Sequence, residues 1–372
     1  MMNWTRRSLV GAALATLTAM PAVGQEKISA VVIDGYPARA LWVKEFTNFF
    51  IPAVDKRLAK TGNYEMSWQE NYGGSIVKPK GVLEGVQLGL GDIGIVTTIF
   101  HSSKLPSQGL AAVTPFVASD ARAVAKAVDE IAREFPAMQN EFAAQNQVYL
   151  ATGVVLNSYQ VFSTSEVSGI AGLEGKKVAG AGMNLRYLEG IEGIEGIEGI
   201  EGIEGIEGSA GVRGGLTDFY NMLQTGLVDA GMLWPEAAAT FKISEVAPYM
   251  LRADLGAVNS KTVTVNKDYW DGLPEEVKIA LQAVAIEYRD HLAGIAMDRA
   301  AAAEAKYTET GGTIVYVPAE DRAAWANAMP NIAAEWAENL NGKGEQGTEM
   351  LGAYLGKLEA AGFVGVRDWT KP

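Results

Sequence analysis

The chain has 372 residues, 48% of them hydrophobic and 20% charged, a globular composition long enough for two domains with sizeable cores. Its 31 basic and 44 acidic residues give a net charge of −13, which argues against nucleic acid and anionic membrane surfaces as partners. With no cysteine and only two histidines, His101 and His291, the chain is poorly equipped for a zinc site or a thiol nucleophile. We expect no metal, no cofactor and no catalytic residue.

The N-terminus has the features of a secretory signal. Arg6-Arg7 precedes an apolar run, and the small residues Ala22-Val23-Gly24 stand before Gln25. Residues 5–9 also resemble a twin-arginine export signal, with an ordinary export signal that carries two arginines as the alternative. In either case we expect residues 1–24 to be a signal peptide and the mature protein to be exported from the cytoplasm.

The first part of the mature chain alternates predicted strands and helices. The residue patterns predict strands at 27–33, 64–69 and 92–97, with helices at 38–58 and 80–88 between them. Such β-α-β-α-β crossovers imply a largely parallel sheet of an α/β fold.

An Ala-rich helical pattern follows at 119–144, with Ser119 as its candidate N-cap and a break near Pro136. Strands are then predicted at 148–155 and up to Ser163. A later strand near 176–179 and a short strand at Val212 continue the alternation in a second α/β unit.

One helix–turn–strand unit occurs twice. The two copies are residues 87–96 and 223–234. Gly89 and Gly226 suit the left-handed position that terminates a helix. Asp92 and Asp229 follow in the turn, where a short carboxylate can bond nearby backbone N–H groups. Two ordinary joints are one interpretation; the other is a single unit used once in each of two lobes.

Residues 191–208 are the tripeptide Ile-Glu-Gly repeated six times. A period of three keeps no apolar face on either a helix or a strand, and a glycine in each unit disfavours a helix. We expect a flexible or partly helical insertion at a surface turn, with a functional acidic tether as the alternative.

The late part of the chain carries one long helix. Residues 261–266 predict a strand, and Pro274 begins a helical stripe that continues to about Tyr307. That length exceeds what one lobe needs, so the helix is expected to span both lobes. A strand at 312–317 and a helical tail complete the chain.

The residues carry no enzyme motif: there is no phosphate-loop signature and no Gly-x-Ser-x-Gly elbow. Ligands of open α/β sheets bind outside the C-terminal ends of strands. The loops at those ends contain aromatic, amide and charged side chains that could bind a ligand, although each alone could be an ordinary surface or hinge residue. They are Tyr36, Tyr72, Asn157, Tyr159, Gln160, Asn184, Arg186, Arg213, Trp234 and Glu236.

Four segments spread over most of residues 27–310 resemble one protein family. They are Val82–Asp92, Leu173–Val178, Phe219–Asp229 and Val265–Pro274. In them the chain resembles a solute-binding protein of the tripartite ATP-independent periplasmic (TRAP) transporters. The resemblance implies a two-lobe periplasmic binding protein fold with a hinge and a long helix across both lobes. It also implies closure around a small organic solute, expected to be an organic acid, and delivery to TRAP membrane subunits.

The lobes implied by the resemblance divide the mature chain into three parts. Lobe 1 is expected at 25–152, with 237–260 returning to it, and lobe 2 at 153–236, joined by 261–310. Residues 311–372 form the C-terminal strand and helical tail.

Members of this family usually bind the ligand through arginine side chains, and two of the matching positions here are Ala179 and Gln160. Arg213 or Arg186 would then supply the charge. The alternative is a neutral or cationic ligand held by amides, aromatic faces and Glu236. The receptor of an ATP-driven importer for such a ligand is the second interpretation of the function, and a secreted enzyme is a remote third.

Overall fold

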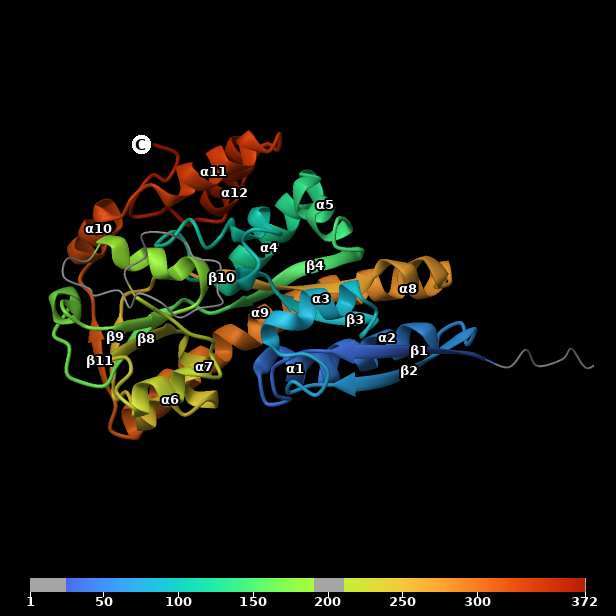
Figure 1. Ribbon diagram of the computed structural model, residues 1–372, viewed down its shortest axis with the longest axis horizontal. Helices are drawn as coiled ribbons and strands as arrows, with labels where there is room; N and C mark the ends of the chain where they lie inside the picture. The colour runs from blue at the N-terminus through green and yellow to red at the C-terminus, as the bar shows by residue number, and fades with distance from the viewer. Residues whose placement is uncertain (1–24, 191–210, 372) are drawn as a thin grey trace, which may run out of the picture.

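The computed structural model describes residues 25–190 and 211–371, and its strands form two sheets that lie side by side (Figure 1). The first sheet has five strands in the order β2 (Tyr64–Asn71), β1 (Glu26–Ile33), β3 (Ile93–Thr97), β10 (Val258–Asn266) and β4 (Gln147–Leu156). β1 pairs in parallel with both of its neighbours, while β10 runs antiparallel between β3 and β4. The predicted parallel start of the fold is therefore present, and an antiparallel strand completes it.

The second sheet has six strands in the order β11 (Thr313–Tyr316), β9 (Tyr249–Arg252), β5 (Gln160–Ser163), β8 (Ala230–Leu233), β6 (Val178–Gly180) and β7 (Val212–Arg213). β5 runs antiparallel to β8 and β9, and the pairs β6–β8, β6–β7 and β9–β11 are parallel. The chain passes from the first sheet to the second between β4 and β5, and returns between β9 and β10.

The return crossing differs from the expected lobe assignment. Segment 237–260 is expected in lobe 1, but its strand β9 lies in the second sheet. β10 begins in that segment and continues into 261–310, which is expected in lobe 2, yet the whole strand lies in the first sheet. All nine residues of β10 are buried, because the strand lies between β3 and β4 in the sheet and helices α3 (Val82–Gln87) and α4 (Ala121–Glu134) pack against it. Strand order along the chain does not determine which sheet accepts a strand, and β9 itself was not predicted.

Helices cover the two sheets and a separate group follows them at the C-terminal end. The α-helices are α1 (Leu41–Glu45), α2 (Ile51–Leu58), α3 (Val82–Gln87), α4 (Ala121–Glu134), α5 (Ala137–Ala143), α6 (Phe219–Gln224), α7 (Pro235–Thr240), α8 (Lys267–Gly272), α9 (Glu275–Glu309), α10 (Ala319–Ala328), α11 (Ile332–Gly342) and α12 (Gly347–Ala360). A π-helical turn, η1 (Phe46–Phe50), joins α1 to α2. The 3₁₀ turns are η2 (Pro79–Gly81), η3 (Thr98–Phe100), η4 (Pro106–Gly109), η5 (Ile170–Leu173), η6 (Gly182–Gly190) and η7 (Ile243–Glu245).

The 35-residue helix α9 spans both lobes, as predicted (Figure 1). In its first half Tyr288 donates its hydroxyl to the Trp42 carbonyl at 2.6 Å, on the first lobe. In its second half Tyr307 donates to the Ala247 carbonyl at 2.9 Å, on the second. One rigid element is thus fastened to both sheets, and the strand crossings beside it form the hinge.

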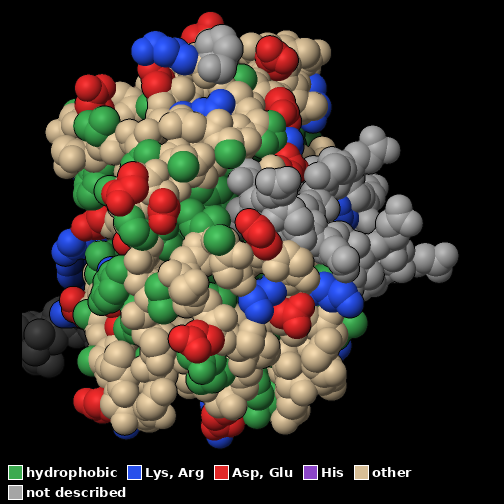
Figure 2. Space-filling model, turned by 90° about the vertical axis from the view of Figure 1, so that its left-hand side faces the viewer, with side chains coloured by type: hydrophobic (Ala, Val, Ile, Leu, Met, Phe, Trp, Pro, Cys, Tyr) green, Lys and Arg blue, Asp and Glu red, His purple; other side chains and the backbone are tan. Residues whose placement is uncertain are grey.

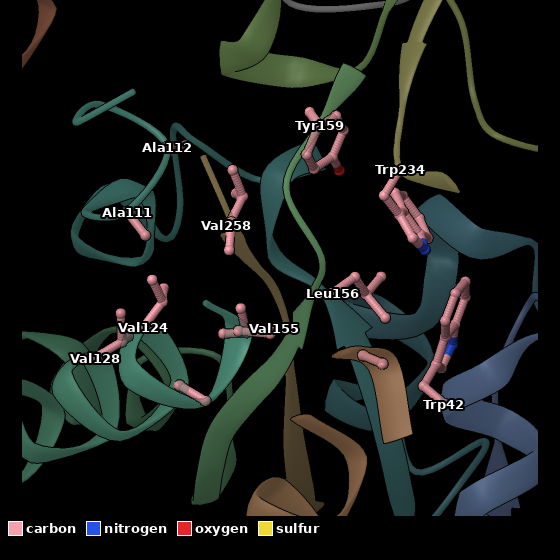
Figure 3. Packing of buried hydrophobic residues seen from close by; sticks show 14 of the residues in the cluster. Trp42, Ala111, Ala112, Val124, Val128, Val155, Leu156, Tyr159, Trp234 and Val258 are labelled. Atoms are coloured by element: carbon pink, nitrogen blue, oxygen red, sulfur yellow. The ribbon is translucent and has the colours of Figure 1, made fainter. Parts of the chain in front are cut away.

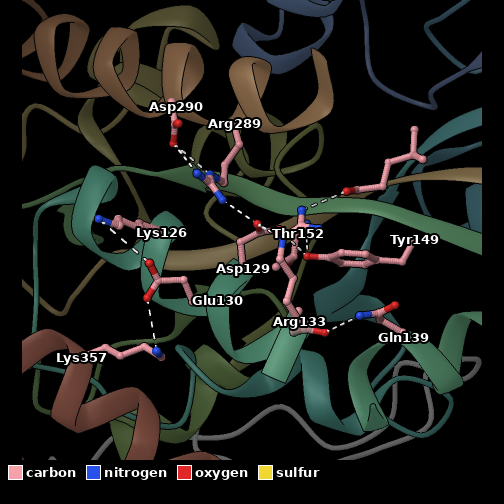
Figure 4. A network of polar contacts seen from close by, with 12 residues as sticks. Lys126, Asp129, Glu130, Arg133, Gln139, Tyr149, Thr152, Arg289, Asp290 and Lys357 are labelled. Carbon is pink, nitrogen blue, oxygen red and sulfur yellow. Dashed lines mark hydrogen bonds and ion pairs between the residues drawn. The ribbon is translucent and has the colours of Figure 1, made fainter. Parts of the chain in front are cut away.

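A buried charged network attaches α9 to the first lobe (Figure 4). Arg289 Nη1 lies 2.5 Å from Asp129 Oδ2, and both side chains are buried. Asp129 also accepts from Arg133 Nε at 2.8 Å and from the Tyr149 hydroxyl at 2.5 Å. Every oxygen of this buried carboxylate therefore has a donor, which is the condition for keeping a charge in a core.

Two predicted helix ends are confirmed and one helix start is corrected. Gly89 and Gly226 both have φ of +71°, in the left-handed region that suits glycine at the end of a helix. The N-cap of α4 is Asp120 rather than Ser119. The Asp120 carboxylate accepts from the backbone N–H groups two and three residues further on, at 2.8 and 3.3 Å, while the Ser119 hydroxyl donates to Ser158.

The aspartates of the repeated unit bond across to a neighbouring strand. Asp92 Oδ2 accepts from the Val31 N–H at 2.8 Å, and Asp229 Oδ2 accepts from the Lys177 N–H at 2.9 Å. In both copies the aspartate's own N–H also donates to the carbonyl of that same neighbour, at 2.8 Å. The same pair of bonds therefore aligns two adjacent strands in each lobe, which supports one unit used twice.

The C-terminal helices α10 to α12 lie against both lobes (Figure 1). Three indole N–H groups of this region donate to loop carbonyls: Trp325 to Tyr187 (2.6 Å), Trp336 to Pro106 (2.8 Å) and Trp369 to Pro115 (2.9 Å).

On the face shown in Figure 2 acidic side chains are spread out rather than gathered into one patch.

Within residues 25–190 and 211–371, no helix combines the length and the apolar composition needed to cross a membrane. The predicted signal peptide 1–24 and the Ile-Glu-Gly repeat 191–208 lie outside the described residues.

Candidate functional site

A cavity lies between the two sheets, at the carboxyl ends of their strands. Its first-lobe wall consists of Tyr36, Ile99, Phe100, Ser260 and Lys261. The cavity volume is about 20 Å³, room for roughly one water molecule. An organic solute therefore enters only when the lobes move apart, which the crossings between the sheets permit.

The second-lobe wall of the cavity is mostly apolar. Leu216, Phe219, Met232 and Leu233 face the first lobe, together with the ring of Trp234. Because these side chains offer dispersion contacts but few hydrogen bonds, this wall suits the apolar body of a ligand.

Aromatic rings connect the two walls beside the cavity (Figure 3). Tyr36 meets Trp42 edge to face at 4.8 Å between ring centres. The Trp42 ring lies 6.4 Å from that of Trp234. Trp234 in turn lies 5.5 Å from Tyr159, which follows the first crossing strand. The four rings come from the first lobe, the hinge and the second lobe, so opening the hinge must separate some of them.

Two buried charged residues, Asp34 and Lys261, interact at the first-lobe wall. The Asp34 carboxylate accepts from the Tyr36 N–H at 2.7 Å and from the Trp42 indole N–H at 3.0 Å. Burial raises the pKa of Asp34 to about 7, against the lowering effect of these bonds and of Lys261. Burial also lowers the pKa of Lys261 to about 8, partly offset by the charge of Asp34.

The Lys261 ammonium group packs on ring faces. Its Nζ lies 4.0 Å from the centre of the Trp42 ring and 5.1 Å from that of Tyr36. The residue is 2% exposed and lines the cavity. Aromatic faces attract a cation, but they do not accept its N–H groups as an oxygen does.

Five buried side-chain polar atoms lack a hydrogen-bond partner within residues 25–190 and 211–371. All five belong to the two chain segments that supply Ile99, Phe100, Ser260 and Lys261 to the first-lobe wall. They are Thr97 Oγ1, Thr98 Oγ1, His101 Nε2, Asn259 Oδ1 and Ser260 Oγ. β3 and its following turn carry three of them, and the paired strand β10 carries two. A buried polar atom without a partner costs about 1–3 kcal/mol, so native structures rarely gather several in one place without a functional reason.

A bulge in β10 directs consecutive side chains to the cavity. The pairing of β10 with β4 shifts register between Asn259 and Lys261, so Ser260 is the extra residue. In a regular strand Ser260 and Lys261 would point to opposite faces, yet both line the cavity. The bulge thus places a hydroxyl and an ammonium group at one site.

The structure brings three of the sequence-predicted site residues together. Tyr36, Tyr159 and Trp234 all line the cavity between the sheets, although they lie far apart in the sequence. They are joined there by two residues that sequence reasoning did not select, Ser260 and Lys261.

Three predicted amide side chains are bonded within the protein instead. Gln160 makes two bonds of 2.9 Å to Asp254, one through each end of its amide. Asn157 Oδ1 accepts from the following N–H at 2.6 Å, and Asn184 Oδ1 accepts from the Ala181 N–H at 2.8 Å. These groups act on the backbone of the hinge and of the second lobe.

Glu236 is buried near the hinge and serves its own helix, α7. Its carboxylate accepts from the Trp234 indole N–H at 3.2 Å and from the Thr240 hydroxyl at 2.7 Å. Burial raises the pKa of Glu236 despite these bonds. The contact orients Trp234, so Glu236 supports the cavity wall rather than lining it.

The other three predicted residues lie outside the cavity. Tyr72 accepts a bond from Thr47 at 3.3 Å on the first lobe. Arg186 lines a separate cavity of about 250 Å³ and pairs with Glu189 at 2.8 Å and with Glu335. Arg213 lies in β7, opposite Gly180 of β6.

The sequence does not single out Lys261 as a binding residue, because the pattern around it predicts a strand and nothing more. Residues 261–266 alternate in the manner of a half-buried strand, where a terminal lysine is ordinarily exposed. The sequence carries one indication, the place of Lys261 at the start of a strand that follows both α/β units.

Residues 212–339 match the family model described as bacterial extracellular solute-binding protein, family 7. This segment contains the second copy of the repeated unit, β10 and the whole of α9. Over 125 residues the chain is 33% identical to the C4-dicarboxylate-binding periplasmic protein DctP of Rhodobacter capsulatus. That alignment covers 33% of this chain and 37% of the relative, so the chain matches about a third of the relative's length.

Solved TRAP solute-binding proteins share the fold over nearly the whole chain. A protein from Rhodoferax ferrireducens in complex with benzoate has a TM-score of 0.76 at 16% identity, over 90% of this chain and 98% of its own. A protein from Bordetella bronchiseptica with bound mandelate has a TM-score of 0.74 at 18% identity, over 90% and 99%. The resemblance to TRAP solute-binding proteins is confirmed. The two-lobe TRAP-type fold extends well beyond the matched segment, into both sheets and the hinge.

Proposed function

We propose that this protein is a periplasmic solute-binding receptor that captures a small organic acid and delivers it to a TRAP-type membrane permease. The observation that carries the proposal is the position of the cavity. It lies between two sheets that are joined by crossing strands and fastened to one long helix. Such an arrangement opens and closes around a ligand without breaking either core.

Three further observations support a binding role. The cavity combines an apolar wall with a few convergent polar groups, which is the usual composition of small-molecule sites. Similar folds hold benzoate, mandelate and pyroglutamic acid in their own structures. The matched relative is named as a C4-dicarboxylate-binding protein. An organic acid is therefore the first ligand class to test.

The mechanism follows from differential affinity. In the closed arrangement the two walls approach to within a water-sized gap, so a bound solute must hold them slightly further apart while touching both. A solute that contacts both lobes stabilises the closed state over the open one, and only this difference shifts the equilibrium. The permease would then recognise the closed, loaded receptor. No covalent step is part of the proposal.

The test is a ligand screen of the chain without its predicted signal peptide, residues 25–372. Organic acids, amino acids, polyols and amines are compared by thermal shift, and hits are measured by calorimetry and small-angle scattering. A ligand at 100 times its Kd adds about 2.7 kcal/mol of stability, enough to raise the melting temperature by a few degrees. Stabilisation by an acid with a smaller radius of gyration supports the proposal. No stabilisation by any of these compounds would overturn it.

A further inference from the structure

We infer that Lys261 and Ser260 form the carboxylate-binding subsite of the cavity and that the ligand is a monocarboxylate with an apolar body. This inference rests on the proposed function and names the ligand class for that site. The positions where the family usually carries arginines hold Ala179 and Gln160, so the charge must come from elsewhere in the structure.

The first step concerns the fate of the expected arginine positions. Ala179 is fully buried in β6 and carries no polar side-chain atom. Both ends of the Gln160 amide are occupied by Asp254. Neither residue can therefore receive a carboxylate in this fold.

The second step concerns Arg186, the arginine of η6. Its guanidinium group pairs with Glu189 at 2.8 Å and with Glu335 of α11. It lines the neighbouring cavity and not the one between the sheets. A ligand would have to displace two carboxylates to use this cation.

The third step identifies the cation and donor that remain at the cavity. Lys261 contacts two ring faces through its Nζ, and a carboxylate oxygen would satisfy its N–H groups where the rings cannot. Ser260 is 1% exposed and lines the same cavity, and its buried hydroxyl has no partner within the described ranges 25–190 and 211–371. An ammonium and a hydroxyl from consecutive residues that line one cavity match the two oxygens of one carboxylate.

The fourth step concerns the rest of the ligand. Opposite the two donors stand Leu216, Phe219 and Met232, with Ile99 and Phe100 beside them. A second carboxylate on the ligand would lie against these apolar side chains and lose its hydration without compensation. An aromatic or branched aliphatic body would instead gain contact on both sides.

The experiment uses the chain 25–372 with neutral, singly charged and doubly charged ligands. Calorimetry compares benzoate and phenylacetate with their amides, and with succinate and terephthalate as dicarboxylates. We expect the monocarboxylates to bind roughly 100-fold more tightly than the amides, as removal of one partner of a buried charged contact implies. The dicarboxylates should bind more weakly than the monocarboxylates.

Variants then assign the charge to a residue. Lys261→Met should weaken monocarboxylate binding roughly 100-fold, and Ser260→Ala roughly tenfold. Lys267→Met removes an exposed lysine of α8 that pairs with Asp271 at 2.5 Å, and it should leave affinity unchanged. Arg186→Met should also leave affinity unchanged. Because Lys261→Met alone leaves Asp34 buried without its counter-charge, the double variant Asp34→Asn/Lys261→Met is measured in parallel, with melting temperatures as the folding check.

The outcomes separate this inference from the proposed function. If a folded Lys261→Met or double variant keeps full affinity for a monocarboxylate, or Arg186→Met loses it, the subsite is wrong while the receptor role stands. A preference for dicarboxylates also overturns the subsite alone. A preference for amides or neutral solutes overturns the subsite together with the organic-acid ligand class, and leaves only the solute-binding role. Only the failure of every solute in the wider screen overturns the proposed function, and the subsite with it.

Discussion

The ammonium group of Lys261 lies 4.0 Å from the centre of the Trp42 ring, on the wall of the cavity between the two sheets. The same ring donates its indole N–H to Asp34, at 3.0 Å. One aromatic side chain thus separates a buried cation from a buried anion while contacting both. This arrangement makes the charge of the cavity wall sensitive to pH near neutrality.

Affinity for a monocarboxylate should fall as the pH rises from 6 to 9. Burial raises the pKa of Asp34 to about 7, so above that pH its negative charge opposes an arriving anion. Burial lowers the pKa of Lys261 to about 8, so the ammonium group loses its charge above that pH. The affinity for the monocarboxylate should then fall by up to about tenfold per pH unit. Both steps weaken binding in the same direction. Besides burial, the charge of Asp34 raises the pKa of Tyr36, Tyr72 and Tyr288, and Tyr159 and Asp218 raise that of Tyr36 further.

The measurement is calorimetry with benzoate at several pH values. Near pH 7.5 binding should take up protons, which two buffers of different ionisation enthalpy reveal. Melting temperatures without ligand are recorded at the same pH values, so that a general loss of folding is not mistaken for a loss of affinity. An affinity that stays constant or rises between pH 6 and 9 would contradict the prediction.

Replacing Arg289 by methionine should destabilise the protein by about 3 kcal/mol or more, because it leaves the Asp129 carboxylate short of a buried partner. The remaining cation, Arg133, is 44% exposed and cannot replace that contact fully. Urea unfolding measures the loss. Lys126→Met is the control, since its contact with Glu130 is exposed and 4.0 Å long, and its effect should stay within about 0.5 kcal/mol. Equal effects of the two variants would refute a special role for the buried network.

Alanine at Gly89 and at Gly226 should cost the same amount, about 1–2 kcal/mol each, because both have φ of +71° and free space around a new Cβ atom. The cost is backbone strain alone. Gly294→Ala is the matched control: it lies inside α9, its Cβ also meets nothing within 4 Å, and alanine there should stabilise by about 0.5–1 kcal/mol. Unequal losses at Gly89 and Gly226, measured by chemical denaturation, would argue against one unit used twice.

Glutamine at position 141 should reduce the pH dependence of stability between pH 5 and 8. Glu141 accepts from the Ser107 N–H and hydroxyl at 2.8 and 2.6 Å, and burial raises its pKa to about 7. Since the folded pKa lies above the unfolded value, the stability from the protonated acid is present at low pH and lost as the pH rises through 7. Glutamine has no such proton to lose. The difference should be roughly 1–3 kcal/mol across that range.

Urea unfolding of wild type and Glu141→Gln at pH 5 and pH 8 provides the measurement. Glu65→Gln removes an exposed carboxylate whose contact with Lys27 is 3.7 Å long, and it controls for the general effect of net charge. Identical pH slopes for wild type and Glu141→Gln would show that Glu141 does not carry this effect.

Local patterns predicted most of the elements that frame the cavity. The strands near 27–33, 64–69 and 92–97 and the helix from Pro274 onward are present, because apolar periodicity and helix-terminal glycines act over a few residues. Segment 249–252 was missed as a strand. Its four residues gain their strand conformation from pairing with β5 and β11, which lie distant in the sequence.

Some of the predicted binding residues line the cavity, and others are bonded to neighbouring groups of the protein. Tyr36, Tyr159 and Trp234 were selected because they follow strands, and the carboxyl edges of those strands do meet at the cavity. Gln160 and Asn184 follow strands too, but nearby backbone and carboxylate groups occupy them. Which polar side chains remain available is decided by neighbours that no spacing in the sequence reveals.

The sequence by itself determined the two-lobe α/β plan, the long helix and the resemblance to TRAP solute-binding proteins, because these depend on periodicity and on contiguous segments. It also showed that the expected arginines are absent. Only the tertiary structure decided what stands in their place. The return crossing puts β10 between β3 and β4, and its bulge at Ser260 brings that hydroxyl and the Lys261 ammonium to one wall. A buried lysine beside Trp42 arises from packing between segments more than two hundred residues apart, a distance over which sequence patterns carry no register.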